Sequence, residues 1–293
     1  MRKLLLHLDT SVHPSAFDRI VALDGGADEV LSYGGVSPDA VRDLVHGAIF
    51  TRGPKDLHHT AIFIGGTDMS AGERLLKAVK DTFFGPMRVS VMLDSNGSNT
   101  TAVAAVAKLQ RAVGELSGRR AVVTAGTGPV GMRAAGLLAK GGADVVVTSR
   151  RTDGSASVAD SIQQRFGAAV RPVAMAGAAQ AASVLEGAEL LLNAGGAGVC
   201  LVPREAWLGR SGLRAAADVN AVPPLGIEGV EVTDDGVERD GVKTFGALGV
   251  GGLKMKIHKA CIARLFERND LVLDAETIAD LAREIAPPPS SSG

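Results

Sequence analysis

The fold is decided by the stretch Ala121–Gly131, which reads AVVTAGTGPVG and changes from an apolar run into a glycine-rich turn. Gly126, Gly128 and Gly131 have the spacing G-x-G-x-x-G. In a dinucleotide-binding unit the first glycine makes a tight turn and the second lets the backbone approach a pyrophosphate. The third lets the following helix pack closely on the strand. The stretch therefore predicts a strand, a phosphate-binding turn and the start of a helix.

The flanking segments supply the context that a lone glycine motif lacks in a chain with 37 glycines. Arg120–Thr124 has the pattern of a strand, Met132–Lys140 is an alanine- and leucine-rich helix, and Asp144–Thr148 is a second strand. This order predicts a Rossmann-type unit, in which the N-terminus of the helix faces the anion. We expect the cofactor to contact the whole turn, namely Gly126, Thr127, Gly128, Pro129, Val130 and Gly131.

The end of the second strand predicts which nucleotide is preferred, because it reaches the adenosine ribose. An acid there would accept hydrogen bonds from the ribose hydroxyls, whereas arginine suits a 2′-phosphate. The sequence reads Ser149-Arg150-Arg151, and the first acid is Asp153. We therefore expect Ser149, Arg150 and Arg151 to bind NADP, with NAD possible but disfavoured. The alternative is that the two arginines are an ordinary solvated pair.

Composition and charge exclude several classes of protein. The length of 293 residues predicts two domains. A hydrophobic content of 46% is sufficient for globular cores. A formal net charge of -1 gives no electrostatic footprint for nucleic acid or an anionic membrane. Cys200 and Cys261 lie far apart, and no residue spacing indicates a metal site. The sequence has no export signal and no apolar run of membrane-spanning length, so we expect a cytoplasmic protein.

Strand-like and helix-like segments alternate along the chain, which predicts an α/β fold with mostly parallel sheets. We expect an N-terminal α/β domain over residues 1–104, completed by a C-terminal helix within 268–286. A Rossmann-type, doubly wound parallel sheet is expected over 105–267, and 287–293 should be a disordered tail. A strand ending near Ala194 and Gly195 would lie beside the nicotinamide half of a cofactor, and Asn220, at the next strand end, near its ribose.

Four blocks of sequence carry a family resemblance: Leu93–Thr101, Ala125–Met132, Asn220–Ile227 and Phe245–Lys254. Together they resemble the NADP-dependent methylene-tetrahydromethanopterin/methylene-tetrahydrofolate dehydrogenases of methylotrophic bacteria. The likeness runs from Asp9 to Ala286. It implies an N-terminal pterin-binding domain, a C-terminal Rossmann domain and a homo-oligomer.

The resemblance implies hydride transfer to NADP from a reduced pterin that carries a one-carbon group. Such a reaction needs positioning of two carbons more than acid–base residues, which fits a chain without a recognisable catalytic triad or metal motif. Two alternatives stay open. One is another two-domain NADP-dependent oxidoreductase of the shikimate-dehydrogenase type, and the other is a non-catalytic NADP sensor. The physiological carrier, tetrahydromethanopterin or tetrahydrofolate, is also open.

Lys254 is the candidate for a catalytic, substrate-contacting residue. It follows a glycine-rich segment, and we expect a helix to begin at about this residue and run to Glu267. A lysine at a helix start opposes the helix dipole, so a pterin carbonyl or a carboxylate should compensate. The alternative is that Lys254, Lys256, His258 and Lys259 form one solvated face, and Lys256 is the weaker candidate for the same role.

Four further residues are candidates for binding the pterin. Asn96, Ser98 and Asn99 offer paired donors and acceptors that suit the amide edge of a pterin. Their alternative role is to form a turn and cap the next helix. Asp18, on the first predicted helix, could accept a hydrogen bond from the pterin amino group, or could be an ordinary exposed carboxylate.

Overall fold

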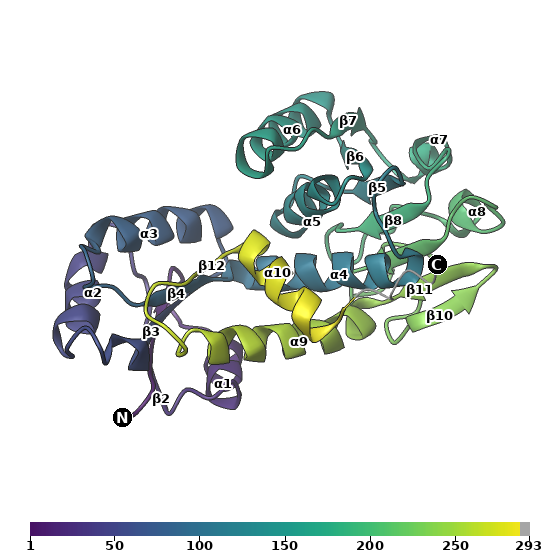
Figure 1. Cartoon of the computed structure of the whole chain (residues 1–293). Coiled ribbons are helices and arrows are strands. Elements are labelled where there is room, and N and C mark those ends of the chain that lie inside the picture. The colour runs from purple at the N-terminus through teal and green to yellow at the C-terminus, as the bar shows by residue number, and fades with distance from the viewer. Residues whose placement is uncertain (288–293) are drawn as a thin grey trace. The chain divides into compact units, whose positions relative to one another are not determined.

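The computed structural model describes residues 1–287, and the chain divides into two compact units (Figure 1). Of the described residues, unit 1 comprises 1–100 and 255–281, and unit 2 comprises 101–254 and 282–287. The divisions fall after Thr100 and after Lys254, each inside a long helix, whereas the sequence suggested residues 104 and 267. Almost all of the tail that we expected to be disordered lies outside the described residues.

Unit 1 is built on a five-stranded parallel sheet with the strand order β12-β4-β3-β1-β2. Its strands are β1 Leu4–Asp9, β2 Glu29–Tyr33, β3 Thr60–Gly65, β4 Ser90–Leu93 and β12 Val272–Leu273. Its helices and helical turns are α1 Ala16–Asp24, α2 Val41–Phe50, η1 Leu57–His59, α3 Met69–Thr82 and η2 Ser95–Gly97, with parts of α4 Ser98–Val113, α9 Ala247–Arg264 and α10 Ala275–Ile285.

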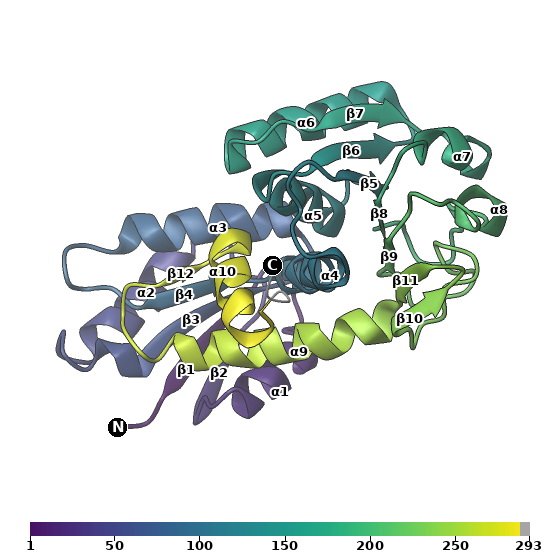
Figure 2. The ribbon, with the colours of Figure 1, turned by 45° about the vertical axis from the view of Figure 1, so that its right-hand side comes forward.

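Both faces of this sheet are covered, as expected for parallel strands. Leu6 and Leu8 of β1 point to the face of α2 and α3, where they join a buried apolar cluster. The alternate residue His7 points to the opposite face, where its neighbour Phe63 stacks against His258 of α9. Figure 2 shows α2 and α3 on one face, and α1 and α9 on the other. This arrangement leaves the carboxyl ends of the strands to the polar loops that follow β1, β3 and β4.

Unit 2 is built on a seven-stranded sheet with the order β10-β11-β9-β8-β5-β6-β7. Its strands are β5 Arg120–Thr124, β6 Asp144–Ser149, β7 Arg171–Ala174, β8 Leu190–Asn193, β9 Ala215–Asp218, β10 Asp235–Arg239 and β11 Val242–Phe245. Its shorter helices are α5 Pro129–Lys140, α6 Thr152–Phe166, η3 Ala178–Gln180, α7 Ala181–Val184 and α8 Arg204–Trp207. The six parallel strands have the Rossmann order, and the order reverses between β5 and β8. The predicted α/β class and Rossmann-type sheet are confirmed.

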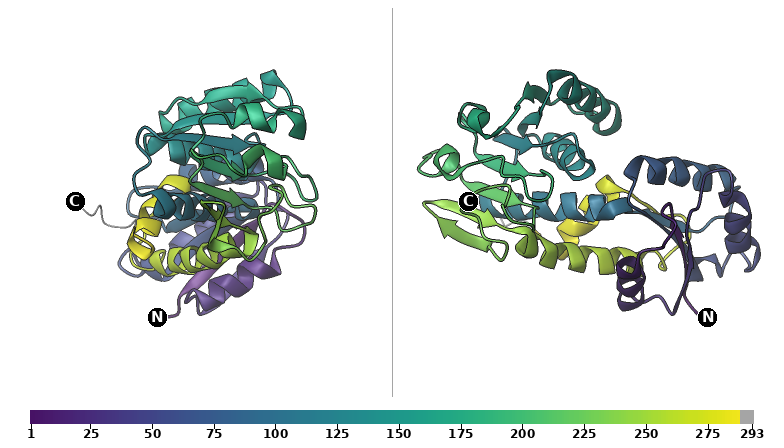
Figure 3. Two further views of the ribbon diagram at one scale, coloured as in Figure 1. Left: turned by 90° about the vertical axis from the view of Figure 1, so that its right-hand side faces the viewer. Right: turned by 180° about the vertical axis from the view of Figure 1, so that it is seen from behind.

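The antiparallel strand β10 is an addition that the sequence analysis did not anticipate. It forms a hairpin with β11 at the edge of the sheet, visible as two yellow-green arrows in the right panel of Figure 3. The buried carboxylate of Asp234 holds this hairpin, because it accepts two hydrogen bonds from Arg239 and one from Thr244. Burial raises the pKa of Asp234, but these hydrogen bonds outweigh that effect and leave the pKa below its ordinary value.

Helix α9 begins at Ala247, seven residues before the predicted start at Lys254. Two of the glycines that suggested a loop, Gly246 and Gly249, are required by close packing. A Cβ on Gly246 would lie 1.9 Å from the carbonyl oxygen of Glu231, and one on Gly249 would lie 2.0 Å from that of Asp234. Tertiary packing therefore overrides the low helix propensity of glycine. Lys254 lies about two turns inside the helix, so the expected conflict with the helix dipole does not arise.

We predict opposite effects for two glycine substitutions in α9. Gly249→Ala should lower the free energy of unfolding by about 1–3 kcal/mol, because the new methyl group overlaps a backbone oxygen that cannot move freely. Gly252→Ala is the matched control, since its Cβ would meet no atom within 4 Å. The control should raise the free energy of unfolding by up to about 1 kcal/mol. Urea denaturation measures both, and equal effects would contradict the packing argument.

Candidate functional site

The turn between β5 and α5 has the geometry of a phosphate-binding loop. A Cβ on Gly126 would lie 2.1 Å from Cγ2 of Val147, and one on Gly131 would lie 2.7 Å from Cα of Gly126. These two glycines therefore allow strand, turn and helix to pack together. A Cβ on Gly128 would find its nearest neighbour at 3.9 Å, so the backbone is open to a ligand. Gly128 is also the N-cap of α5, followed by Pro129.

The motif suggested that the first glycine, Gly126, makes the tight turn. In the structure, Ala125 makes it instead. Ala125 has φ 52°, in the left-handed region that is uncommon for a residue with a side chain. Its N–H donates to Oγ1 of Thr148 at 3.2 Å, and the next N–H, of Gly126, donates to the carbonyl of Thr148 at 2.8 Å. These bonds hold the turn against the end of β6.

Two cavities adjoin this turn. The larger, about 510 Å³, is lined by Ala125, Thr127, Gly128, Pro129, Thr148, Ser149, Arg150, Met175, Ala194, Gly196, Val199 and Leu201. The smaller, about 440 Å³, is lined by Thr127, Ser149, Arg150, Arg151, Asp153, Gly154 and Ser157. They share three residues, which the sequence analysis had selected, and each is large enough for part of a dinucleotide. Most of the residues predicted to bind the cofactor therefore line these two adjoining cavities.

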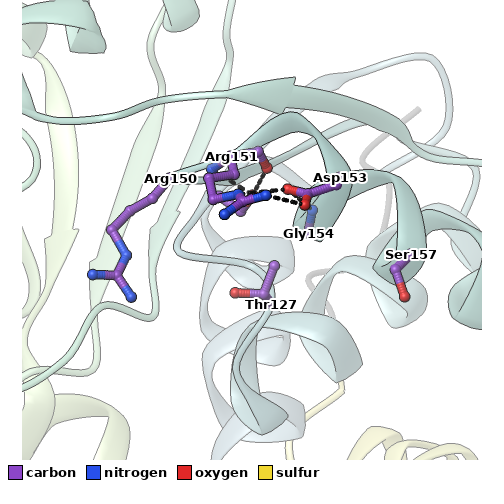
Figure 4. A pocket seen from close by; sticks show the side chains of 7 residues that line it. Thr127, Arg150, Arg151, Asp153, Gly154 and Ser157 are labelled. Atoms are coloured by element: carbon purple, nitrogen blue, oxygen red, sulfur yellow. Dashed lines mark hydrogen bonds and ion pairs between the residues drawn. The ribbon is translucent and has the colours of Figure 1, made fainter.

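The two arginines at the end of β6 are in different environments. Arg151 forms a two-pronged ion pair with Asp153, with Nε to Oδ1 at 3.0 Å and Nη2 to Oδ2 at 2.6 Å. Arg150 lines both cavities, and its guanidinium extends away from that pair (Figure 4). The hydroxyl of Ser149 bonds to the backbone of Arg151 and fixes the bend that separates the two side chains.

A buried chain of polar side chains joins the carboxyl ends of three central strands. Thr124 of β5 donates from Oγ1 to Oδ1 of Asn193 of β8 at 2.7 Å. Nδ2 of Asn193 donates to Oδ1 of Asp218 of β9 at 2.8 Å. Burial raises the pKa of Asp218, and its hydrogen bonds oppose that shift. The sequence analysis missed all three residues, and the only available signal was a polar residue at the end of each strand.

This chain positions the loops beside the larger cavity. Oδ1 of Asn193 accepts from the N–H of Gly195 at 3.3 Å. The carboxylate of Asp218 accepts from the N–H of Asn220 at 3.0 Å and from that of Ile227 at 2.9 Å. Asn220 uses its own amide within its loop, with Oδ1 accepting from Val222 and Nδ2 donating to Pro224. Neither Asn220 nor Gly195 is among the residues that line the cavities, whereas Ala194 lines the larger one.

In unit 1, the predicted pterin residues divide between the surface and the interior. Asn96 is exposed with φ 56°, and its N–H donates to the carbonyl of Gly66 at 2.6 Å. Ser98 and Asn99 are fully buried. Nδ2 of Asn99 donates to the carbonyl of Leu93, and its backbone N–H donates to Asp94. Ser98 and Asn99 thus support the loop from inside, and Asn96 is the member exposed at its surface.

Asp18 lies in a polar cluster at the carboxyl end of β1. One ligand atom from each of His7, Asp9 and Asp18 lies within 4.8 Å of the other two. These three side chains could hold a metal ion, and the sequence did not predict this group. Both oxygens of Asp9 also accept backbone N–H groups, from Ser11 and Ser15, which shapes the loop into α1. Burial lowers the pKa of His7 against the opposing effect of Asp9, so its ring is neutral at neutral pH. Asp18 is half-buried, whereas His7 and Asp9 are buried.

The two lysines considered for the reaction also differ in exposure. Lys254 is half-buried in α9, whereas Lys256 is exposed. The sequence favoured Lys254 but did not predict this difference in exposure, because the predicted helix start was too late by about two turns.

The chain is similar in sequence to known proteins along almost its whole length. Residues 16–96 match the model of the N-terminal domain of methylene-tetrahydromethanopterin dehydrogenase. The "Bifunctional protein MdtA" of Methylorubrum extorquens is 52% identical over 286 residues, covering 97% of this chain and 99% of the relative. The chain belongs to the methylene-tetrahydromethanopterin dehydrogenase family. A second relative from that organism, an "NAD(P)-dependent methylenetetrahydromethanopterin dehydrogenase", is 33% identical and covers 98% of this chain and 100% of itself.

Solved structures agree on the architecture. A shikimate 5-dehydrogenase from Listeria monocytogenes has a TM-score of 0.55 at 14% identity, covering 97% of this chain and 96% of its own. A 5-ketofructose reductase from Gluconobacter sp. strain CHM43 has a TM-score of 0.53 at 14% identity, covering 97% of this chain and 99% of its own. At this identity the likeness concerns the fold alone. Within residues 1–287, no helix combines the length and apolar character needed to cross a bilayer.

We predict that the hydroxyl of Thr124 supports nucleotide binding through Asn193. Thr124→Val keeps the shape of the side chain but removes the donor, and should cost about 1 kcal/mol of unfolding free energy. It should also weaken NADPH binding several-fold, because the loop after Asn193 forms a wall of the larger cavity. Thr124→Ser should restore both properties.

The matched control is Thr244→Val, which removes another buried hydroxyl, here donating to Asp234, from a residue that lines neither cavity. It should lower stability and leave NADPH binding unchanged. Fluorescence titration of NADPH and urea denaturation measure the two effects. Equal NADPH affinity in Thr124→Val and the unaltered protein would contradict the prediction.

Proposed function

We propose that this protein transfers a hydride to NADP+ from methylene-tetrahydromethanopterin, methylene-tetrahydrofolate or both, giving the methenyl form. The single observation that carries this proposal is the open backbone at Gly128, next to a cavity containing Arg150, in a chain of this family. Gly128 suits a pyrophosphate and Arg150 suits a 2′-phosphate. Bound NADP+ would supply the nicotinamide carbon that accepts the hydride.

The residues of unit 2 would hold and orient this cofactor. We assign the diphosphate to the turn Gly126–Gly131 and the adenosine ribose to Ser149, Arg150 and Arg151. Ala194, Gly195 and Asn220 belong to the nicotinamide end, Ala194 as a cavity wall and the other two through their loops. The buried chain from Thr124 to Asp218 keeps those loops in place.

For the pterin, we assign direct contacts to Asp18, Asn96 and Lys254. Asp18 offers acceptors for an amino group, and Asn96 is exposed on its loop. Ser98 and Asn99 act from the interior by fixing that loop. Lys254 would orient a pterin oxygen, since an ammonium at the bridge carbon would oppose the cation formed there. We also infer a cytoplasmic protein, and a homo-oligomer following the family resemblance; light scattering tests the assembly.

The decisive experiment is an absorbance assay at the nicotinamide band with purified protein, NADP+ or NAD+, and each methylene carrier. We expect reduction of NADP+ with at least one carrier. Shikimate with NADP+ serves as the comparison substrate for the fold-related alternative. A protein that binds NADPH but reduces NADP+ with none of these substrates would instead be a nucleotide sensor.

We predict that Lys254→Ala lowers turnover with the reduced pterin, by up to about a hundredfold, because a misplacement of about 1 Å at the reacting carbons has effects of this size. NADPH affinity and unfolding free energy should be unchanged. The exposed neighbour provides the control, and Lys256→Ala should have little effect. A rise in the Michaelis constant alone would assign Lys254 to ground-state binding. Unaltered kinetics in Lys254→Ala, or a larger loss in Lys256→Ala, would remove the lysine from the site.

We predict that Arg150 contributes to NADP preference. Replacing Arg150 and Arg151 together by alanine should raise the Michaelis constant for NADP+ about tenfold or more, since a charge-assisted contact contributes about 1.5–3 kcal/mol. Arg150→Ala alone should account for most of this loss, because Arg151 already pairs with Asp153. The constant for NAD+ should change little. Arg171→Ala, which removes an arginine paired with Asp144 outside the cavities, is the control. Equal losses with both nucleotides would contradict the assignment.

A further inference from the structure

An acid lies in the cavity that would receive the 2′-phosphate. Asp153 lines the smaller cavity together with both arginines, and its two carboxylate oxygens bind the guanidinium of Arg151 (Figure 4). The same carboxylate accepts the N–H of Gly154 at 2.9 Å, which places it in the first turn of α6. The Arg151 guanidinium, then the Gly154 N–H, hold the pKa of Asp153 below its ordinary value. The carboxylate is therefore ionised at neutral pH.

The ion pair can be opened by a ligand. The side chains of Arg151 and Asp153 are 80% and 65% exposed, and pairs this exposed contribute little to stability. Arg151 can therefore exchange Asp153 for another anion without disturbing the fold. Asp153 is more constrained than Arg151, because its bond to Gly154 keeps the carboxylate at the helix N-terminus.

Asp153 has opposite effects on the two nucleotides. It repels a 2′-phosphate and competes with it for Arg151, but it can accept hydrogen bonds from the free hydroxyls of the NAD ribose. Arg150 is not part of this competition, since its guanidinium extends away from the pair. The cavity therefore combines one arginine directed away from the acid with one that the acid holds.

We propose that Asp153 sets the nucleotide selectivity of this protein, restraining Arg151 from the 2′-phosphate and accepting from the ribose hydroxyls of NAD. This inference rests on the proposed function and deepens it. Arg150 is the source of the preference for NADP over NAD. Asp153 moderates that preference, so that the protein binds both nucleotides.

Gly154 supports a ligand role for this corner. Glycine lowers helix stability at this position, yet a Cβ there would lie 3.2 Å from Oγ of Ser149 and 3.9 Å from Cγ2 of Thr127, both in the cavity wall. The absent side chain keeps the space between turn and helix open.

The test measures dissociation constants of NADPH and NADH by fluorescence titration, with no one-carbon carrier present. Asp153→Asn should tighten NADPH about fivefold, because removal of one like charge near the phosphate changes the interaction by an amount of this order. It should weaken NADH several-fold. Arg151→Ala should weaken NADPH less than Arg150→Ala does, and it should leave NADH nearly unchanged. The control Asp160→Asn removes an exposed acid from the same helix, outside the cavity, and should change neither constant.

The outcomes separate this inference from the proposed function. If Asp153→Asn leaves the ratio of the two constants within twofold of the unaltered protein, or weakens NADPH, then Asp153 does not restrain Arg151 and the inference fails. Absence of NADPH and NADH binding in the unaltered protein would overturn the proposed function itself. Thermal melting of Asp153→Asn checks folding, and a melting curve that stays cooperative keeps the binding result interpretable.

Discussion

The loops that follow β8 and β9 of the Rossmann unit depend on one buried carboxylate. Asp218 lies at the end of β9, accepts from Asn193 on the neighbouring strand, and accepts the backbone N–H groups of Asn220 and Ile227. A buried carboxyl group of this kind is tolerated only when hydrogen bonds replace its hydration. Because Asn193 ends β8 and the two N–H groups lie in the loop after β9, the requirement to satisfy one carboxylate fixes that loop against the end of β8.

This requirement also explains a glycine outside the phosphate-binding turn. A Cβ on Gly226 would lie 1.7 Å from Nδ2 of Asn193 and 3.0 Å from Oδ1 of Asp218. The carbonyl of Gly226 meanwhile accepts the N–H groups of Leu201 and Val202, which joins the loop after β8 to the loop after β9. Within the block Asn220–Ile227, the buried polar chain therefore leaves no room for a side chain at Gly226.

Sequence patterns predicted what depends on neighbours along the chain. The βαβ unit around Ala121–Gly131, the α/β class and the arginines after β6 all came from signals within about thirty residues of one another. The polar chain could not be found in this way, because Thr124 and Asn193 are 69 residues apart and Asn193 and Asp218 are 25 apart. Only the strand order brings their ends together. The start of α9 was predicted too late for the same reason, since Gly246 and Gly249 pack against residues 231–235, which the local pattern could not show.

The two ends of the proposed cofactor site differ in how firmly they are held. At the nicotinamide end, Thr124, Asn193 and Asp218 are buried and make several hydrogen bonds each, so a change there moves backbone loops. At the adenosine end, Arg151 and Asp153 are exposed side chains whose interaction is screened by water and salt. Reaction geometry tolerates displacements of only a fraction of an ångström, whereas selectivity between two nucleotides requires only a small difference in binding free energy. A rigid, buried network suits the first demand, and a loosely held surface ion pair is sufficient for the second.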